Sequence, residues 1–71
     1  MRKLTDGEEH VYEKIKEFIN INGYSPTIRE LCKTTRYTSP ATICSYLMRL
    51  RDKEYISYVD NKNRTIRIIG G

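Results

Sequence analysis

The chain has 71 residues, the length of one small domain, which leaves no room for a catalytic domain beside a recognition domain. Hydrophobic residues make up 38% of it and charged residues 31%, a balance typical of folded globular domains, and no apolar stretch is long enough to cross a membrane or form a secretory signal. We therefore expect a single domain over residues 1–71, located in the cytoplasm and without a membrane partner.

The net charge of +4 is divided unevenly along the chain. Residues 1–30 carry five basic and six acidic side chains, whereas residues 31–71 carry eight basic and three acidic ones. An anionic partner such as nucleic acid would therefore meet the second half of the chain. Charge alone leaves a second interpretation open, in which the basic residues only form a solvated face.

Residues that commonly carry metal or covalent chemistry are few. The chain has two cysteines, Cys32 and Cys44, outside any CxxC pair, and one histidine, His10. Four zinc ligands cannot be assembled from these side chains, and no cysteine–histidine pair has a third group to orient it. We therefore expect no metal site, no cofactor and no enzymatic activity, with reduced thiols and His10 on the polar surface of its helix.

The first predicted helix lies between Thr5 and Gly23. Thr5 and Glu8 have the spacing of a capping box, in which each side chain accepts the other residue's backbone N–H. Apolar residues then recur at helical spacing and predict one buried stripe: Val11, Ile15, Phe18, Ile19 and Ile21. Gly23 can adopt the left-handed conformation that ends a helix. The acidic residues of this helix indicate a supporting role and not a phosphate-facing one.

A second, short helix is predicted after Pro26, which disfavours helical conformation in the residue before it. Thr27 and Glu30 repeat the capping-box spacing at its start, and the helix N-terminus at Thr27 could offer free backbone N–H groups to a phosphate. Residues 36–38 predict a tight turn, with Tyr37 filling the junction between two helices.

The third predicted helix covers residues 39–54. Its start is the clearest, because Ser39 is a preferred capping residue and Pro40 a preferred first residue. Its predicted core stripe is Ile43, Leu47 and Leu50. The opposite side and flanks of its first turns hold small or polar side chains: Ala41, Thr42, Cys44 and Ser45. Arg49, Arg51 and Lys53 near its end complement the helix dipole, a role that does not exclude contacts to phosphates.

The end of the chain changes from helical to strand patterning. Residues 55–59 and 64–69 are rich in β-branched and aromatic side chains, and the polar residues 60–63 between them have the length of a hairpin turn. The basic tip over residues 60–64 is expected to act as a wing against phosphates or the minor groove. Its candidate contacts are Lys62, Asn63 and Arg64.

This order predicts an α+β fold of the winged helix-turn-helix class, with three helices followed by a two-stranded antiparallel β-hairpin. A helix about 10–12 Å across fits the DNA major groove, which is about 12 Å wide. The residues predicted to bind double-stranded DNA are Thr27, Ser39, Ala41, Thr42, Cys44, Ser45, Arg49, Lys53, Lys62, Asn63 and Arg64. A second interpretation stays open, in which this fold docks on a larger protein assembly, because the six tyrosines suit protein surfaces.

The stretch from Leu4 to Ile69 resembles the N-terminal DNA-binding domain of the LexA repressors. The resemblance is carried by residues 23–31 (GYSPTIREL), 39–42 (SPAT) and 64–68 (RTIRI). It implies a transcriptional repressor of the SOS response that binds operator DNA, usually as two copies on an inverted repeat. It also implies base contacts at Ala41, Thr42, Cys44 and Ser45.

Two departures from the family pattern set further expectations. LexA-like repressors continue into a C-terminal domain whose Ser/Lys dyad cleaves the chain and which also dimerises it, so we expect here a missing dimerisation domain or a dimer formed on DNA. Many members have Asn and Glu at the recognition positions, where this chain has shorter side chains with fewer hydrogen-bonding groups. We therefore expect a different operator or weaker base discrimination than in those members.

Overall fold

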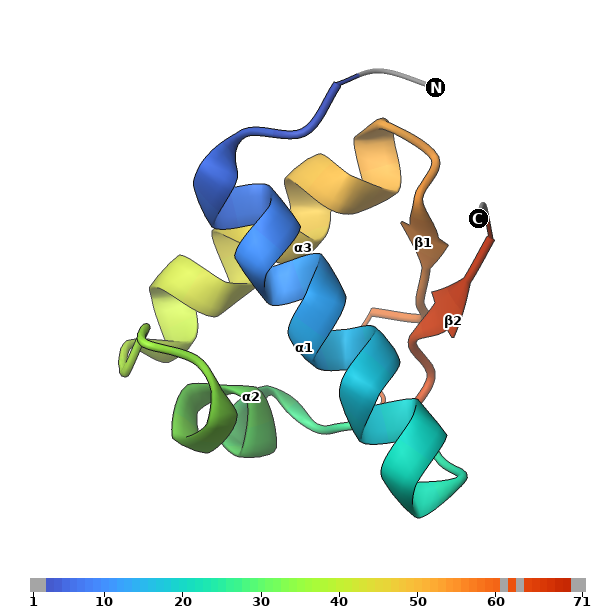
Figure 1. Cartoon of the computed structure of the whole chain (residues 1–71). Helices are drawn as coiled ribbons and strands as arrows, with labels where there is room; N and C mark the ends of the chain where they lie inside the picture. The colour runs from blue at the N-terminus through green and yellow to red at the C-terminus, as the bar shows by residue number, and fades with distance from the viewer. Residues whose placement is uncertain (1–2, 61, 63, 70–71) are drawn as a thin grey trace.

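The structure is a computed structural model that describes residues 3–60, 62 and 64–69. Its elements are α1 (Asp6–Asn22), α2 (Ile28–Thr34), α3 (Pro40–Asp52), β1 (Ile56–Ser57) and β2 (Arg67–Ile68) (Figure 1). The strands form an antiparallel sheet in which Ile56 faces Ile68 and Ser57 faces Arg67. The predicted order of three helices and a hairpin is confirmed.

Local capping fixes the first two helix starts as the sequence predicts. The Glu8 Oε1 atom accepts the Thr5 N–H at 2.9 Å, and the Thr27 N–H donates to Glu30 Oε1 over the same distance. Each threonine hydroxyl accepts the N–H of its glutamate in return. Gly23 ends α1 with a φ of 78°, the left-handed conformation expected of it.

Ser39 caps α3 differently from what we expected. Its side chain makes no capping hydrogen bond, although Pro40 does occupy the start of the helix. The reason is the backbone: ψ is 124° at Ser39, against 167° and 166° at the two threonine caps. Ser39 is exposed to solvent.

The core lies where the three helices meet the hairpin. Its buried apolar side chains are Val11, Tyr12 and Ile15 of α1, Leu31 of α2, Ile43, Leu47 and Leu50 of α3, and Ile56 and Ile66 of the hairpin. The predicted stripe of α3 is therefore confirmed. Ile21 is a correction to the stripe of α1, because the last turn of that helix extends beyond the core and leaves Ile21 71% exposed (Figure 1).

The paired strands are shorter than the sequence predicts, and the segment that joins them, residues 58–66, is longer. Side-chain bonds replace the strand ladder here. The Thr65 hydroxyl accepts the Val59 N–H at 3.0 Å and the Ile66 N–H donates to the Ser25 hydroxyl at 3.1 Å. Arg64 turns the chain with a φ of 58°. We call the described residues of this segment, 58–60, 62 and 64–66, the wing.

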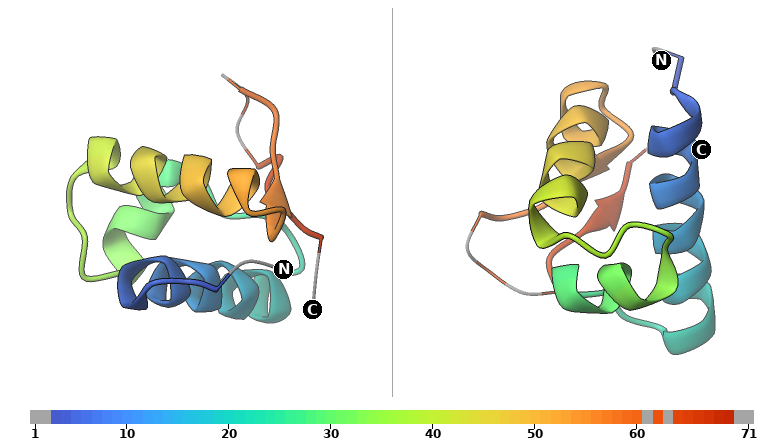
Figure 2. Two further views of the ribbon diagram at one scale, coloured as in Figure 1. Left: turned by 90° about the horizontal axis from the view of Figure 1, so that it is seen from above. Right: turned by 90° about the vertical axis from the view of Figure 1, so that its left-hand side faces the viewer.

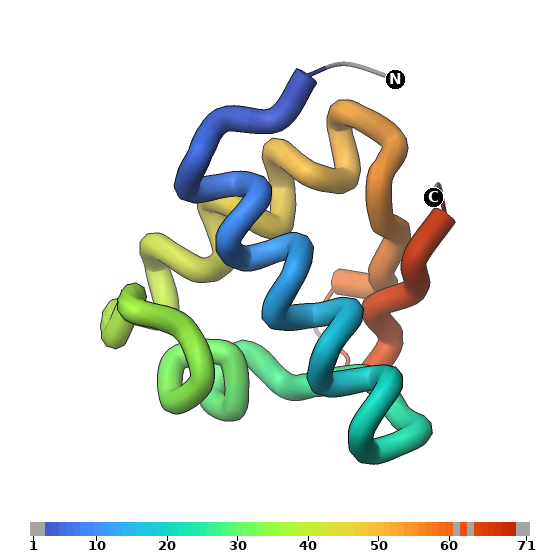
Figure 3. The backbone as a smooth tube through the Cα atoms, in the orientation of Figure 1, coloured from blue at the N-terminus to red at the C-terminus, as the bar shows by residue number. Residues whose placement is uncertain are grey.

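The wing and α3 lie on the same side of the domain. Both views of Figure 2 show the wing projecting beside α3, with α1 on the opposite side. Figure 3 shows the short turn between α2 and α3, which sets the two helices at an angle to each other. No helix in the part of the chain that the structure describes is long and apolar enough to span a membrane.

Candidate nucleic-acid interface

The exposed face of α3 brings five of the eleven predicted contact residues together. Because Ile43, Leu47 and Leu50 point into the core, the opposite side of the helix faces solvent. The side chains there are exposed at Ala41, Ser45 and Arg49 and half-buried at Thr42 and Cys44. The first turns of α3 therefore present small groups and hydroxyls, with a cation about two turns further on.

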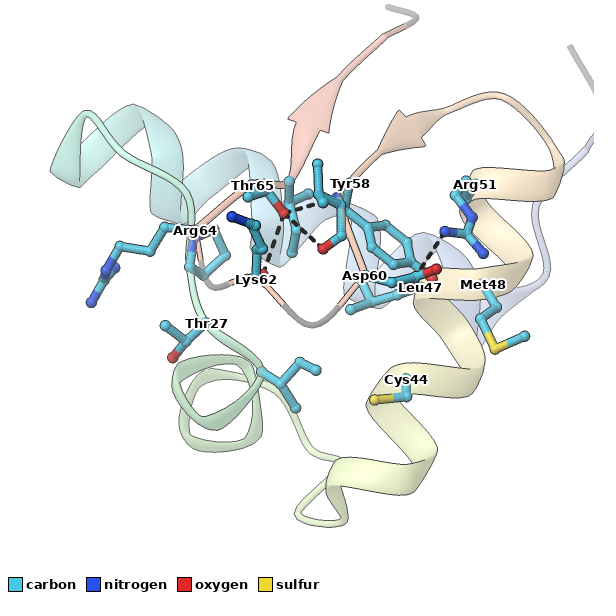
Figure 4. Close-up of a pocket in the computed structure, with 14 residues that line it drawn as sticks. Thr27, Cys44, Leu47, Met48, Arg51, Tyr58, Asp60, Lys62, Arg64 and Thr65 are labelled. Atoms are coloured by element: carbon cyan, nitrogen blue, oxygen red, sulfur yellow. Dashed lines mark hydrogen bonds and ion pairs between the residues drawn. The ribbon is translucent and has the colours of Figure 1, made fainter.

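A groove of about 560 Å³ separates this helix from the wing (Figure 4). Cys44, Met48 and Arg51 of α3 line one wall, and Tyr58 and Lys62 of the wing belong to the other. Thr27 and Arg64 also border it. The structure thus brings predicted residues from α2, α3 and the wing to one hollow.

Arg51 is a cation at this groove that was not among the eleven residues predicted to bind DNA. Its guanidinium lies 4.3 Å from the centre of the Tyr58 ring, and its Nη1 atom lies 3.2 Å from Asp60 Oδ1. Burial, the largest influence, raises the pKa of Tyr58, and Arg51 opposes that rise. Cys44, Met48 and Arg51 follow i, i+4, i+7 spacing, so a helical wheel could have placed Arg51 on the groove side.

Arg64 is held by protein partners on the side of the wing away from α3 (Figure 4). Its Nη1 and Nη2 atoms donate to the two carboxylate oxygens of Glu30 at 3.0 and 3.1 Å. Nη1 also donates to the Ser25 carbonyl at 3.0 Å. The Thr27 N–H, and secondly Arg64, lower the pKa of Glu30.

Lys53 is not brought to the exposed face of α3. Its ammonium lies 2.5 Å from Glu8 Oε1 and donates to the Lys3 carbonyl at 3.0 Å. Glu8 is only 2% exposed. Burial alone would raise its pKa, but the hydrogen bonds from Lys53 and from the Thr5 N–H outweigh burial and hold the pKa below its ordinary value.

Three further predicted residues have distinct surroundings. Thr27 borders the groove, but its hydroxyl and N–H are engaged in the capping box of α2. Ser39 is exposed beside the N-terminus of α3, and Lys62 is exposed on the wing. Asn63 lies outside the described residues. Within the described ranges, no group of three His, Cys, Asp or Glu side chains could hold a metal ion.

The turn before α3 is fixed by aromatic packing. Tyr37 is partly buried against the core, and the centres of the Tyr37 and Tyr46 rings lie 4.9 Å apart. The predicted position of Tyr37 at a helix junction is therefore confirmed. His10 is a correction: it is half-buried, and its Nε2 atom accepts the Arg36 N–H at 3.3 Å. The chain folds the turn back against α1, which brings His10 to it. Burial, and then Arg36 and Lys14, lower the His10 pKa.

These features define the class of the protein: a winged helix-turn-helix domain whose third helix and wing form one exposed face. The chain belongs to the LexA DNA-binding domain family, because the family described as "LexA DNA binding domain" matches residues 1–65. Proteins named LexA repressor or transcription regulator LexA are its relatives. It is therefore a DNA-binding domain of the kind found in proteins named LexA repressor.

Three relatives show the extent of the similarity. The LexA repressor of Desulfatibacillum aliphaticivorans is 41% identical over 69 residues, which cover 97% of this chain and 34% of the relative. That of Moorella thermoacetica is 42% identical over 59 residues, or 83% of this chain and 29% of the relative. The transcription regulator LexA of Synechocystis is 35% identical over 97% of this chain and 34% of its own length. The chain thus spans about a third of these relatives.

Proposed function

We propose that this domain binds a double-stranded DNA operator with α3 in the major groove and the wing against the backbone. One observation carries the proposal: α3 and the wing lie on the same side of the domain (Figure 2), and the first turns of α3 expose small side chains. Ala41 and Ser45 are exposed in the first turns of α3, where short side chains let the helix backbone approach base edges.

The roles of the cations follow from their partners. Arg49 and Lys62 are exposed, and within the described ranges no carboxylate forms an ion pair with either. Both are therefore available for phosphates. Removal of one phosphate contact is expected to reduce the slope of log affinity against log salt by about 0.9.

The salt slope tests these roles directly. Arg49→Gln and Lys62→Gln should each weaken binding to any duplex and flatten its salt dependence. Lys16→Gln is the matched control, because Lys16 belongs to α1, on the opposite side of the domain. Equal slopes for all three variants would refute the phosphate roles.

Operator preference is the second part of the proposal. Selection of bound duplexes from a random library should return an inverted repeat if two copies bind side by side. Short recognition side chains offer few bidentate bonds, so we expect weak binding to the operators of relatives with Asn and Glu at these positions. A preference of about a hundredfold or more for such an operator over scrambled DNA, which corresponds to about 2.7 kcal/mol, would refute this. Absence of salt-dependent duplex binding would instead favour a protein-docking module.

A further inference from the structure

The guanidinium of Arg64 makes three hydrogen bonds within the domain. Two parallel hydrogen bonds join it to Glu30, the bidentate geometry in which arginine binds carboxylates best. A third bond reaches the Ser25 carbonyl, and the guanidinium carbon lies 4.7 Å from the centre of the Tyr24 ring. Arg64 therefore joins the wing to the segment that leads into α2.

The backbone beside Arg64 is anchored at the same place. Ser25 is buried, and its hydroxyl accepts the N–H of Ile66, which is itself buried in the core. Arg64 adopts a left-handed φ of 58°, a conformation that is rare for a residue with a long side chain. Such a conformation persists where the surroundings impose it. Side-chain and backbone contacts together fix this end of the wing.

The partner of Arg64 has a second task. Glu30 also accepts the Thr27 N–H in the capping box of α2. One carboxylate therefore connects the start of α2 to the wing, and its negative charge neutralises Arg64. A DNA phosphate would compete with Glu30 for this cation, whereas Lys62, two residues earlier, has no such competitor among the described residues.

We propose that Arg64 is a positioning residue: its ion pair with Glu30 fixes the wing on the cap of α2, so that the wing is oriented toward the side of α3 before DNA binds. Arg64 itself contributes no phosphate contact. The inference rests on the proposed function for its effect on DNA, but the orientation of the wing is a property of the free domain and is measurable without DNA.

The test compares three variants with a matched arginine. Arg64→Gln removes the charge. Glu30→Gln removes the ion pair and keeps the capping box, because glutamine can also reach back to the capping residue. Arg64→Lys keeps the charge without the bidentate bond. Arg67→Gln is the control, because Arg67 is exposed on β2 and forms no ion pair among the described residues.

Hydrogen exchange of the Ile66 N–H in the free domain is the first measurement. We expect exchange about two to five times faster in Arg64→Gln and Glu30→Gln, the factor expected for a partly exposed ion pair, with an intermediate effect in Arg64→Lys and none in Arg67→Gln. Unchanged exchange in both Arg64→Gln and Glu30→Gln would overturn the positioning role.

Duplex binding across a salt series is the second measurement. We expect both glutamine variants to lose affinity by a similar factor, to keep the wild-type salt slope, and to show no additional loss when combined. A slope reduced by about 0.9 in Arg64→Gln, together with tighter binding by Glu30→Gln, would show Arg64 to be a phosphate contact and overturn the proposal. If the wild-type domain bound no duplex, the proposed function would fail, while hydrogen exchange would still decide the role of Arg64.

Discussion

Replacement of Lys53 by methionine should destabilise the domain strongly and spare any DNA contact. Lys53 pairs with the almost fully buried carboxylate of Glu8 and donates to the Lys3 carbonyl, so it joins the end of α3 to the start of α1. Methionine keeps most of the apolar stem but leaves the Glu8 charge buried without its cation. An uncompensated charge of this kind costs far more than the loss of a surface ion pair.

The expected loss is about 3 kcal/mol. Breaking a buried ion pair by removing one partner costs about 3–5 kcal/mol, and we take the lower end because the Lys53 side chain is 20% exposed and water can reach the site. A 71-residue domain has a total stability of roughly 4–10 kcal/mol. At about 4–8 °C per kcal/mol, the melting temperature should fall by roughly 12–24 °C.

Urea unfolding followed by circular dichroism, repeated across a pH series, measures this effect. In the wild type the Glu8 pKa is lowered on folding, so the stabilisation is complete above about pH 4.5 and is lost as the pH falls through the folded-state pKa. In Lys53→Met, burial acts on the Glu8 carboxylate without the opposing cation, so the folded-state pKa of Glu8 is higher than in the wild type. Acid therefore neutralises the unpaired charge more readily. The stability gap between the two proteins should therefore narrow as the pH falls below about 5.

Lys62→Met is the matched control, because Lys62 is exposed and its loss should change stability by less than about 0.5 kcal/mol. The two variants should also differ on DNA at a temperature where both are folded: only Lys62→Met should flatten the salt slope. The reasoning would be refuted if Lys53→Met were as stable as Lys62→Met. It would also be refuted if Lys53→Met reduced the slope of log affinity for the duplex against log salt.

Three further predictions concern the turn, the start of α1 and the groove. The His10 pKa is lowered on folding, so the stabilisation that neutral His10 provides is present above about pH 6.5 and is lost as the pH falls. His10→Gln should therefore flatten the pH dependence of the melting temperature in this range. An unchanged pH profile would contradict this. Gly7→Ala should lower the free energy of unfolding, measured with urea, by about 1 kcal/mol, because the added Cβ would overlap the Tyr46 ring. A higher free energy of unfolding would show that the ring moves aside at little cost. Asp60→Asn should remove the ion pair that holds Arg51, which leaves Arg51 free to contact a phosphate. Duplex affinity should then rise, and the slope of log affinity against log salt should steepen by about 0.9. An unchanged slope would argue against a phosphate contact by Arg51.

The helices could be predicted because their determinants are local. A capping box involves two residues three apart, as in Thr5 and Glu8, and a core stripe repeats every three or four residues. The same locality explains why Ser39 occupies the predicted N-cap position of α3 but makes no side-chain capping bond. Its residue type favours an N-cap, but the bond depends on a backbone angle that the neighbouring turn sets.

The partners of the charged residues could not be predicted from sequence patterns. Lys53 lies 45 positions from Glu8, and Arg64 lies 34 positions from Glu30, so only the tertiary fold brings each pair together. As isolated residues, both cations look like the exposed Lys62. Composition thus indicated where positive charge would gather, but not which charges the domain neutralises internally.

The proposed recognition face of α3 is separate from the contacts that hold the domain together. Ala41 and Ser45 are exposed, and none of the ion pairs, aromatic contacts or capping bonds described above involves them. Mutations at these two positions can therefore accumulate with little effect on folding. A lineage could acquire a new target sequence one substitution at a time while the scaffold stays intact, and an engineer could randomise the same positions without first restabilising the domain.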